Sequence, residues 1–188
     1  GQKVLIQRPV YYPFFSAIEN NGAEIVSSRL ILDGDRYQMD FDDLEKKAAD
    51  SATSLYILCS PHNPVGRVWT RGELTRVGEI CLKHRVLVVA DEIHADLIYK
   101  GITFTPFAAI SQEMAHNAVV CTAPSKTFNL AGLHTSNIII PDDSYRRRFQ
   151  QTLNSSGIGR WASAFGVVAC ETAYREGEPW LAQVMAYI

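Results

Sequence analysis

The chain has 188 residues, of which 47% are hydrophobic, and a formal net charge of −2 at pH 7. This length and composition can bury the core of one large domain, and the small net charge gives no electrostatic reason to expect nucleic acid or an anionic membrane as a partner. No apolar stretch approaches the ~20 residues that a membrane-spanning helix needs, and no signal peptide is visible.

Short apolar runs alternate with stretches of helical periodicity along the chain. The apolar runs are rich in β-branched residues and bounded by turn residues, which is typical of strands covered on both faces. We predict strands at residues 3–7, 24–30, 54–60, 86–91, 118–123 and 136–140. We predict helices at residues 14–21, 40–50, 70–84, 143–154 and 161–176. This alternation predicts an α/β fold with a mostly parallel sheet flanked by helices.

Two of the predicted helices have recognisable first residues. Thr70 followed by Glu73 has the spacing of a capping box, in which each side chain bonds the other residue's backbone N–H. Asp40 opens another stretch of helical periodicity.

Both ends of the chain are abrupt. The first predicted strand begins almost at residue 1, without an initiator methionine, and residues 178–188 stop inside an amphipathic helical pattern. We therefore expect residues 1–188 to be one domain, cut from a longer chain at both ends.

The four cysteines, Cys59, Cys81, Cys121 and Cys170, have no CxxC spacing, and three of them lie in or beside apolar runs. This pattern predicts reduced, buried thiols in a cytoplasmic protein rather than a disulfide framework.

Polar or ionisable residues follow three of the predicted strands, in "CSPHNPVG", "ADEIH" and "TAPSK". In parallel α/β sheets, ligands bind outside the carboxyl ends of the strands. Because these three segments are expected at the same edge of the sheet, their conjunction predicts a ligand site there.

Lys126 follows the strand at 118–123, between Pro124, which stiffens the turn, and Gly132, which permits a close backbone approach. An isolated lysine in such a position is usually solvated. A lysine amine attacks carbonyls and forms Schiff bases when desolvation or a nearby cation lowers its pKa. In this setting we interpret Lys126 as a candidate nucleophile.

Asp91 ends the most apolar strand, where a carboxylate is costly without a cationic partner or several hydrogen bonds. A helix N-cap or an ion pair with an arginine would explain it structurally. Beside a Schiff-base lysine, an aspartate has another use, because it can keep a pyridine nitrogen protonated so that the ring accepts electrons.

Asn63 lies between two prolines in "SPHNPVGRVW", and Tyr11 follows the first strand. Turn chemistry and core packing would account for them. The functional interpretation is that Asn63 donates its amide to a ligand oxygen and that Tyr11 stacks on a planar ring.

Other chemistries lack support in the sequence. The five histidines, His62, His84, His94, His116 and His134, have no paired metal-ligand spacing. The segment "GIGRW" at 157–161 is not a dinucleotide fingerprint, and no serine stands in a GxSxG elbow.

The ordered set "SPHNPVGRVW", "VVADEIHADLIY" and "APSKTFNLAGL" resembles the pyridoxal-phosphate enzymes of the class I/II aminotransferase superfamily (fold type I). Within it, "DEIHADLIY" and "PSKTFN" are most similar to the bacterial carbon–sulfur β-lyases of the MalY/PatB type. The resemblance covers nearly the whole chain. It implies the large, cofactor-binding domain, without the N-terminal phosphate-binding segment and without the C-terminal small domain.

The resemblance implies that Lys126 bonds covalently to pyridoxal 5′-phosphate and removes the substrate's Cα proton. It implies that Asp91 pairs with the pyridine nitrogen and that Asn63 bonds the cofactor's 3-hydroxyl. Tyr11 would stack on the face of the ring.

Thr122 and Ser125, which flank the lysine turn, would contribute hydroxyls to the phosphate. Two positions depart from the aspartate aminotransferase pattern. His94, a further cofactor contact, replaces the tyrosine that bonds the 3-hydroxyl, and His134 replaces a phosphate-binding arginine. Both departures weaken the case for ordinary transamination.

The resemblance therefore implies β-elimination from an S-substituted cysteine, an amino-acid substrate, to a thiol, pyruvate and ammonia, in a homodimer. An amino acid aminotransferase and a non-catalytic, aminotransferase-like sensing domain remain alternatives. We expect the 188-residue piece to be inactive by itself, because the phosphate-binding segment and the substrate-carboxylate arginine are not in it.

Overall fold

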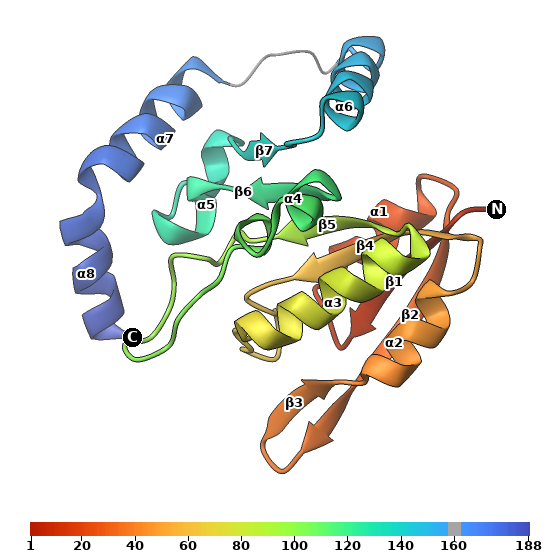
Figure 1. The fold of residues 1–188 in the computed structure, drawn as a ribbon. Helices are drawn as coiled ribbons and strands as arrows, with labels where there is room; N and C mark the ends of the chain where they lie inside the picture. The colour runs from red at the N-terminus through yellow and green to blue at the C-terminus, as the bar shows by residue number, and fades with distance from the viewer. Residues whose placement is uncertain (158–162) are drawn as a thin grey trace.

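Within residues 1–157 and 163–188, the part of the chain that this computed structural model describes, seven strands form one sheet (Figure 1). They are β1 (Lys3–Arg8), β2 (Glu24–Asp33), β3 (Arg36–Met39), β4 (Thr53–Cys59), β5 (Leu87–Asp91), β6 (Ala118–Thr122) and β7 (Asn137–Ile139). Their order across the sheet is β3-β2-β1-β4-β5-β6-β7. Strands β2, β1, β4, β5 and β6 pair in parallel with their neighbours in this order. The edge strands β3 and β7 pair antiparallel with β2 and β6. The predicted mostly parallel sheet is confirmed.

The edge strand β3 is absent from the sequence prediction. β2 continues to Asp33, and the chain then turns through Gly34 so that Asp33 faces Arg36 in an antiparallel hairpin. Gly34 has a φ of +62°, a left-handed conformation that glycine adopts without steric cost. Only Met39 of the four residues of β3 is buried. The strand is therefore too short and too polar to show the alternating apolar pattern from which strands are predicted.

The helices agree with the predicted ones to within a few residues, with additions. They are α1 (Pro13–Glu19), α2 (Phe41–Ala48), α3 (Arg71–His84), α4 (Gln112–His116), α5 (Pro124–Thr127), α6 (Asp143–Ser155), α7 (Ala164–Glu176) and α8 (Glu178–Tyr187), with 3-10 turns η1 (Phe107–Ala109) and η2 (Ala131–Leu133). The short helices α4 and α5 were not predicted as helices. Residues 161 and 162 of the predicted helix at 161–176 lie outside the described residues. Among the described helices, none is long and apolar enough to cross a membrane.

The two predicted helix starts are confirmed. The Asp40 carboxylate accepts the Asp43 N–H at 3.0 Å. The Thr70 hydroxyl accepts the Glu73 N–H at 3.2 Å, and the Glu73 carboxylate accepts the Thr70 N–H at 2.7 Å, which completes the capping box.

The larger hydrophobic core lies between the sheet and helices α2, α3 and α4 (Figure 1). Trp69 and Tyr56 are fully buried in it. At Gly78 of α3, a Cβ atom would lie 2.4 Å from the Met114 sulfur of α4, so a larger residue there would require the Met114 side chain to move. α1 covers a smaller cluster on the opposite face, around Ile6 and Ile18.

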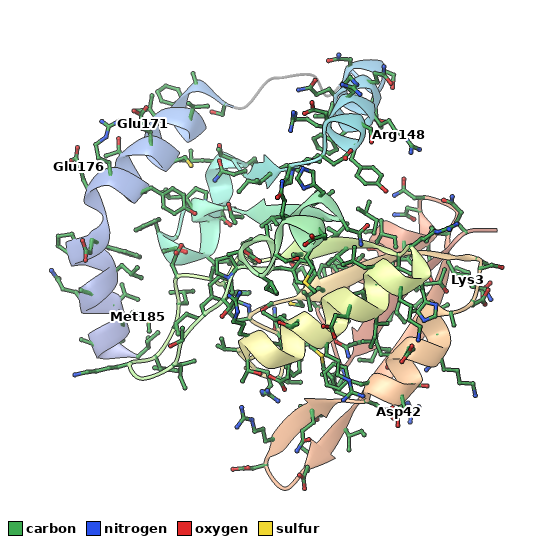
Figure 2. The ribbon with its side chains drawn as sticks, in the orientation of Figure 1. Lys3, Asp42, Arg148, Glu171, Glu176 and Met185 are labelled. Carbon is green, nitrogen blue, oxygen red and sulfur yellow. The ribbon has the colours of Figure 1, made fainter. Side chains whose placement is uncertain are left out.

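Helices α7 and α8 run along the side of the molecule that carries α5 (Figure 1). Glu171 and Glu176 lie on the outer side of α7, away from the sheet (Figure 2). All four cysteines are free, and the predicted burial holds for Cys59 and Cys81, whereas Cys121 and Cys170 are half-buried.

Candidate functional site

A small cavity of about 50 Å³ lies where the carboxyl ends of β4, β5 and β6 meet the segment after β1. Its lining residues are Tyr11, Cys59, Asn63, Asp91, Ile93, His94 and Lys126. Five of the seven residues predicted from the sequence are thus brought together, although they lie far apart in the chain. Their roles toward a cofactor remain predictions.

Lys126 lies in α5, a single helical turn that begins directly after β6. Pro124 occupies the first turn, where a missing backbone N–H costs nothing. The Lys126 side chain is solvent-exposed and lies at the cavity, so burial by the described residues does not desolvate its amine. Among the described residues a Cβ atom at Gly132 would meet nothing within 4 Å, so the close backbone approach predicted there is not observed.

Asp91 is the last residue of β5 and pairs in register with Cys59 on one side and Cys121 on the other. Its carboxylate accepts one backbone N–H, that of Ile93 at 3.2 Å. Burial among these strands raises the pKa of Asp91. Of the ion pairs found among residues 1–157 and 163–188, none includes Asp91, so the arginine pairing considered for it is not observed. The carboxylate is available to a cationic ligand.

His94 lies at the cavity beside Asp91 and Lys126. Burial lowers the pKa of His94; the Asp91 carboxylate opposes this shift, and the Lys126 ammonium adds to it. A neutral imidazole can donate one hydrogen bond to a ligand oxygen through its protonated nitrogen.

Asn63 is held by a rigid loop between β4 and α3. The His62 N–H donates to the Arg67 carbonyl at 2.7 Å, and the Gly66 N–H donates to the His62 carbonyl at 2.9 Å. The Trp69 indole N–H donates to the Cys59 carbonyl at 3.0 Å, which ties the end of the loop to β4. The loop therefore presents the Asn63 amide at a fixed position, as the sequence suggests.

The Arg67 guanidinium stabilises this loop from within. It is buried, lies 4.4 Å from the centroid of the Trp69 ring, and donates to both Glu73 carboxylate oxygens at 2.7 and 3.0 Å. Both bonds come from Nη2, while Nη1 donates to the Tyr37 carbonyl, so the guanidinium is held from two sides.

We expect Glu73→Ala to lower the free energy of unfolding by about 3 kcal/mol, because it leaves the Arg67 charge buried and unpaired. Thr70→Ala removes the helix cap and one hydroxyl bond to the Glu73 carboxylate but keeps the ion pair, so it is the matched control, with an expected loss of about 1 kcal/mol. Urea unfolding of both variants measures the difference. Equal losses would mean that the ion pair contributes nothing beyond the cap.

Tyr11, from the segment after β1, also lines the cavity. The residue is 38% exposed, and its ring packs edge-on against Phe14, with centroids 5.7 Å apart. This support orients the ring and leaves part of it open to a planar ligand.

Thr122 and Ser125 do not line this cavity, so the structure does not group them with the other five residues. The Thr122 hydroxyl accepts the Asn137 side-chain N–H at 3.4 Å, across the antiparallel pair of β6 and β7. The contact of Thr122 and Ser125 with a phosphate remains a prediction. His134, the other departure from the family pattern, is exposed and has a φ of 48°.

The sequence analysis gave no site role to two residues near the cavity, Glu92 and Cys59. Glu92 is 4% exposed, and its carboxylate accepts the Phe107 N–H at 2.7 Å. Burial raises the pKa of Glu92 to about 7. Cys59 lines the cavity directly, and burial raises the pKa of its thiol to about 12. Two adjacent acids at the end of an apolar strand are the only sequence signal for Glu92.

The cavity offers a specific set of chemical groups. An unpaired buried carboxylate suits a protonated ring nitrogen, and the Asn63 amide and His94 imidazole suit an oxygen anion. The Tyr11 ring suits a planar aromatic face, and the Lys126 amine suits an aldehyde. These groups fit an aldehyde of a nitrogen-containing aromatic ring that also carries a hydroxyl group.

Comparisons with known proteins identify the relatives of the chain. The family model described as aminotransferase class I and II matches residues 1–178. Cystathionine β-lyase PatB of Bacillus subtilis (strain 168) is 48% identical over 188 residues, which are 100% of this chain and 48% of that protein. Cystalysin from Treponema denticola, whose crystal structure contains pyridoxal 5′-phosphate, has a TM-score of 0.96 and 41% identity over 99% of this chain and 47% of its own.

A second solved structure, the pyridoxal-phosphate-bound C–S lyase from Staphylococcus hominis, has a TM-score of 0.91 and 38% identity, over 99% of this chain and 46% of its own. The chain thus spans about half the length of the proteins it matches.

Proposed function

Because the chain belongs to the aminotransferase class I and II family, we propose that the protein binds pyridoxal 5′-phosphate and cleaves the carbon–sulfur bond of an S-substituted cysteine. The products are a thiol, pyruvate and ammonia. The observation that carries the proposal is the convergence of Tyr11, Asn63, Asp91, His94 and Lys126 on one cavity. The similarity to proteins named as cystathionine β-lyase and C–S lyase supports this reaction over others of the family.

The residues of the cavity would hold the cofactor by complementary charge. When bound, the cofactor supplies an electron-accepting pyridine ring that stabilises negative charge at the substrate's Cα. The Asp91 carboxylate, which makes no ion pair within the described chain, would accept a hydrogen bond from the ring nitrogen and keep that nitrogen protonated. The Asn63 amide and the His94 imidazole would donate to the oxygen of the 3-hydroxyl without removing its charge. The Tyr11 ring would stack on the face of the pyridine ring and limit its movement.

Lys126 has two roles in the proposal. With the cofactor bound, the Lys126 amine would condense with its aldehyde and release water, and the substrate's amine would then take the place of the lysine. The freed Lys126 amine would take the proton from the substrate's Cα. The electron pair left at Cα would form a Cα–Cβ double bond as the Cβ–S bond breaks, and the sulfur would leave as a thiolate that takes up a proton. Lys126 would then displace the resulting enamine, which water would hydrolyse to pyruvate and ammonia. Ser125, beside Lys126 in α5, and Thr122 at the end of β6 would donate hydroxyl hydrogen bonds to the phosphate.

The test is the requirement for a keto acid. The complete protein, incubated with pyridoxal phosphate and cystathionine, is expected to form pyruvate and thiol in equal amounts without any added keto acid. Pyruvate is followed through its reduction by lactate dehydrogenase. Product formation only in the presence of a keto acid would establish transamination instead. Ligand binding without turnover of any amino acid would establish a sensing domain.

We also propose a homodimer in the cytoplasm. The four free thiols support a reducing compartment. Large exposed apolar side chains, such as those of Tyr12 and Phe165, are of the kind that subunit contacts cover.

A further inference from the structure

The helical turn α5, which carries Lys126, has little support of its own. Its N-cap residue, Ala123, offers no side-chain oxygen to the free N–H groups. The Phe128 N–H donates to the Pro124 carbonyl at 2.9 Å, and the Leu130 N–H donates to the Ser125 carbonyl at 3.1 Å. A single turn with so few bonds is unstable by itself, so contacts from other segments must hold it.

Thr127, the residue after Lys126, makes one such contact. It is fully buried, and its hydroxyl donates to the Asp96 carboxylate at 2.9 Å. A hydrogen bond to a carboxylate is short and directional, so it fixes orientation better than apolar packing does. Since neighbouring residues of a helical turn point to different sides, Thr127 can be anchored inward while Lys126 faces the cavity.

Asp96 belongs to the segment that supplies Asp91, Ile93 and His94 to the cavity lining. This segment starts at Asp91 and coils back on itself, with the Ala95 N–H donating to the Glu92 carbonyl at 2.9 Å and the Leu97 N–H to the His94 carbonyl at 3.0 Å. The bond between Thr127 and Asp96 therefore joins the segment of Asp91 and His94 to the turn of Lys126.

Phe128 provides a second anchor of a different kind. Its ring packs edge-on against Tyr174 of α7, with centroids 5.4 Å apart, and lies 6.1 Å from the Trp180 ring of α8. A Cβ atom at Gly177, between these helices, would lie 2.6 Å from the Phe128 ring. This packing holds the outer end of α5 but makes no link to the side of the cavity formed by Asp91.

We propose that Asp96, acting through the Thr127 hydroxyl, is a positioning residue that sets the distance and direction of Lys126 relative to Asp91 and His94. The inference rests on the proposed function, because it assigns Lys126 the transfer of the substrate's Cα proton. Asp96 touches neither substrate nor cofactor in this proposal.

The kinetic test uses Thr127→Val, which keeps the buried volume and removes the hydroxyl, and Thr127→Ser, which restores it. In the complete, cofactor-loaded protein, we expect Thr127→Val and Asp96→Ala to lower kcat about tenfold with KM within a factor of two. The isotope effect with an α-deuterated substrate should increase, because proton transfer to a misplaced amine becomes rate-limiting. Thr127→Ser should recover most of the loss.

Ser28→Ala is the matched control. The Ser28 hydroxyl is also buried and donates to a carboxylate, that of Asp43 at 2.8 Å. Ser28 lies in β2, which strands β1, β4 and β5 separate from β6 and the turn of Lys126. We expect a similar loss of thermal stability in Ser28→Ala and Thr127→Val, with an unchanged isotope effect in Ser28→Ala. An unchanged isotope effect in both variants would reduce the Thr127 bond to a structural role.

A second measurement does not depend on activity. In the complete protein without cofactor, hydrogen exchange at the Phe128 and Leu130 amides should be at least tenfold faster in Thr127→Val, with exchange at Val89 of β5 unchanged. Unchanged exchange at these two amides would overturn the proposal. If the wild-type protein forms no pyruvate but the exchange result holds, the proposed function fails and the anchoring of α5 stands.

Discussion

Replacing Lys126 by alanine is expected to lower the rate of pyruvate formation from an S-substituted cysteine by about 10³-fold or more. A positioned general base alone contributes about 10²–10⁴-fold, and Lys126 is proposed both to take the Cα proton and to bond the cofactor. The rate is measured on the complete protein, with cofactor content checked by absorbance. Borohydride reduction of the wild-type protein, followed by peptide mapping, should place the cofactor label on Lys126.

Lys100→Ala is the control for Lys126→Ala, because Lys100 is also exposed but does not line the cavity. It should keep the wild-type rate. Small primary amines added to Lys126→Ala should restore part of the activity, which separates loss of the base from loss of the fold. A label on Lys100 or Lys83, or a Lys126→Ala protein with wild-type turnover, would remove Lys126 from the mechanism.

Asp91→Asn is expected to lower the elimination rate by about 10²–10³-fold while leaving the shape of the cavity nearly intact. Asparagine cannot hold the ring nitrogen protonated by charge, and each 1.4 kcal/mol of lost stabilisation at Cα costs about tenfold in rate. Turnover and cofactor affinity are measured together, since a selective loss of turnover indicates an electronic rather than a binding role. Near-normal turnover would mean that the carboxylate is only structural.

Asp91→Asn lowers the expected rate, but it should not lower the stability of the protein without cofactor. Because burial raises the pKa of Asp91 above its ordinary value, the folded protein without cofactor bears a cost for the ionised carboxylate at neutral pH. Asp91→Asn should therefore be at least as stable as wild type near pH 7 when both lack cofactor. The advantage should disappear as the pH falls through the raised pKa toward the ordinary range of aspartate, where the wild-type group is protonated in both states. Asp40→Asn, which alters a half-buried helix cap outside the cavity, is the control for replacing an aspartate by asparagine.

The sheet and part of the site follow from patterns within short segments. The apolar runs at β4, β5 and β6 indicate buried parallel strands, and the rule that ligands bind at their carboxyl ends selects Asn63, Asp91 and Lys126. The short edge strand β3 and the single turn α5 are too brief to give a periodic signal. The bond between Thr127 and Asp96 joins residues 31 positions apart, so no local pattern could indicate it.

The order of the strands also has a consequence for how the protein folds. The cavity takes its residues from the ends of β1, β4, β5 and β6, which are neighbours in the sheet, and more than half of the described chain lies between Tyr11 and Lys126. Parallel pairings at such sequence separations require closure of long loops, which slows folding. A ligand that recognises all four strand ends binds only after these pairings have formed. The ligand therefore stabilises the folded sheet by mass action, by about 2.7 kcal/mol at a concentration of 100 times its Kd. During refolding, the rate of ligand uptake measures how fast the four strands become paired.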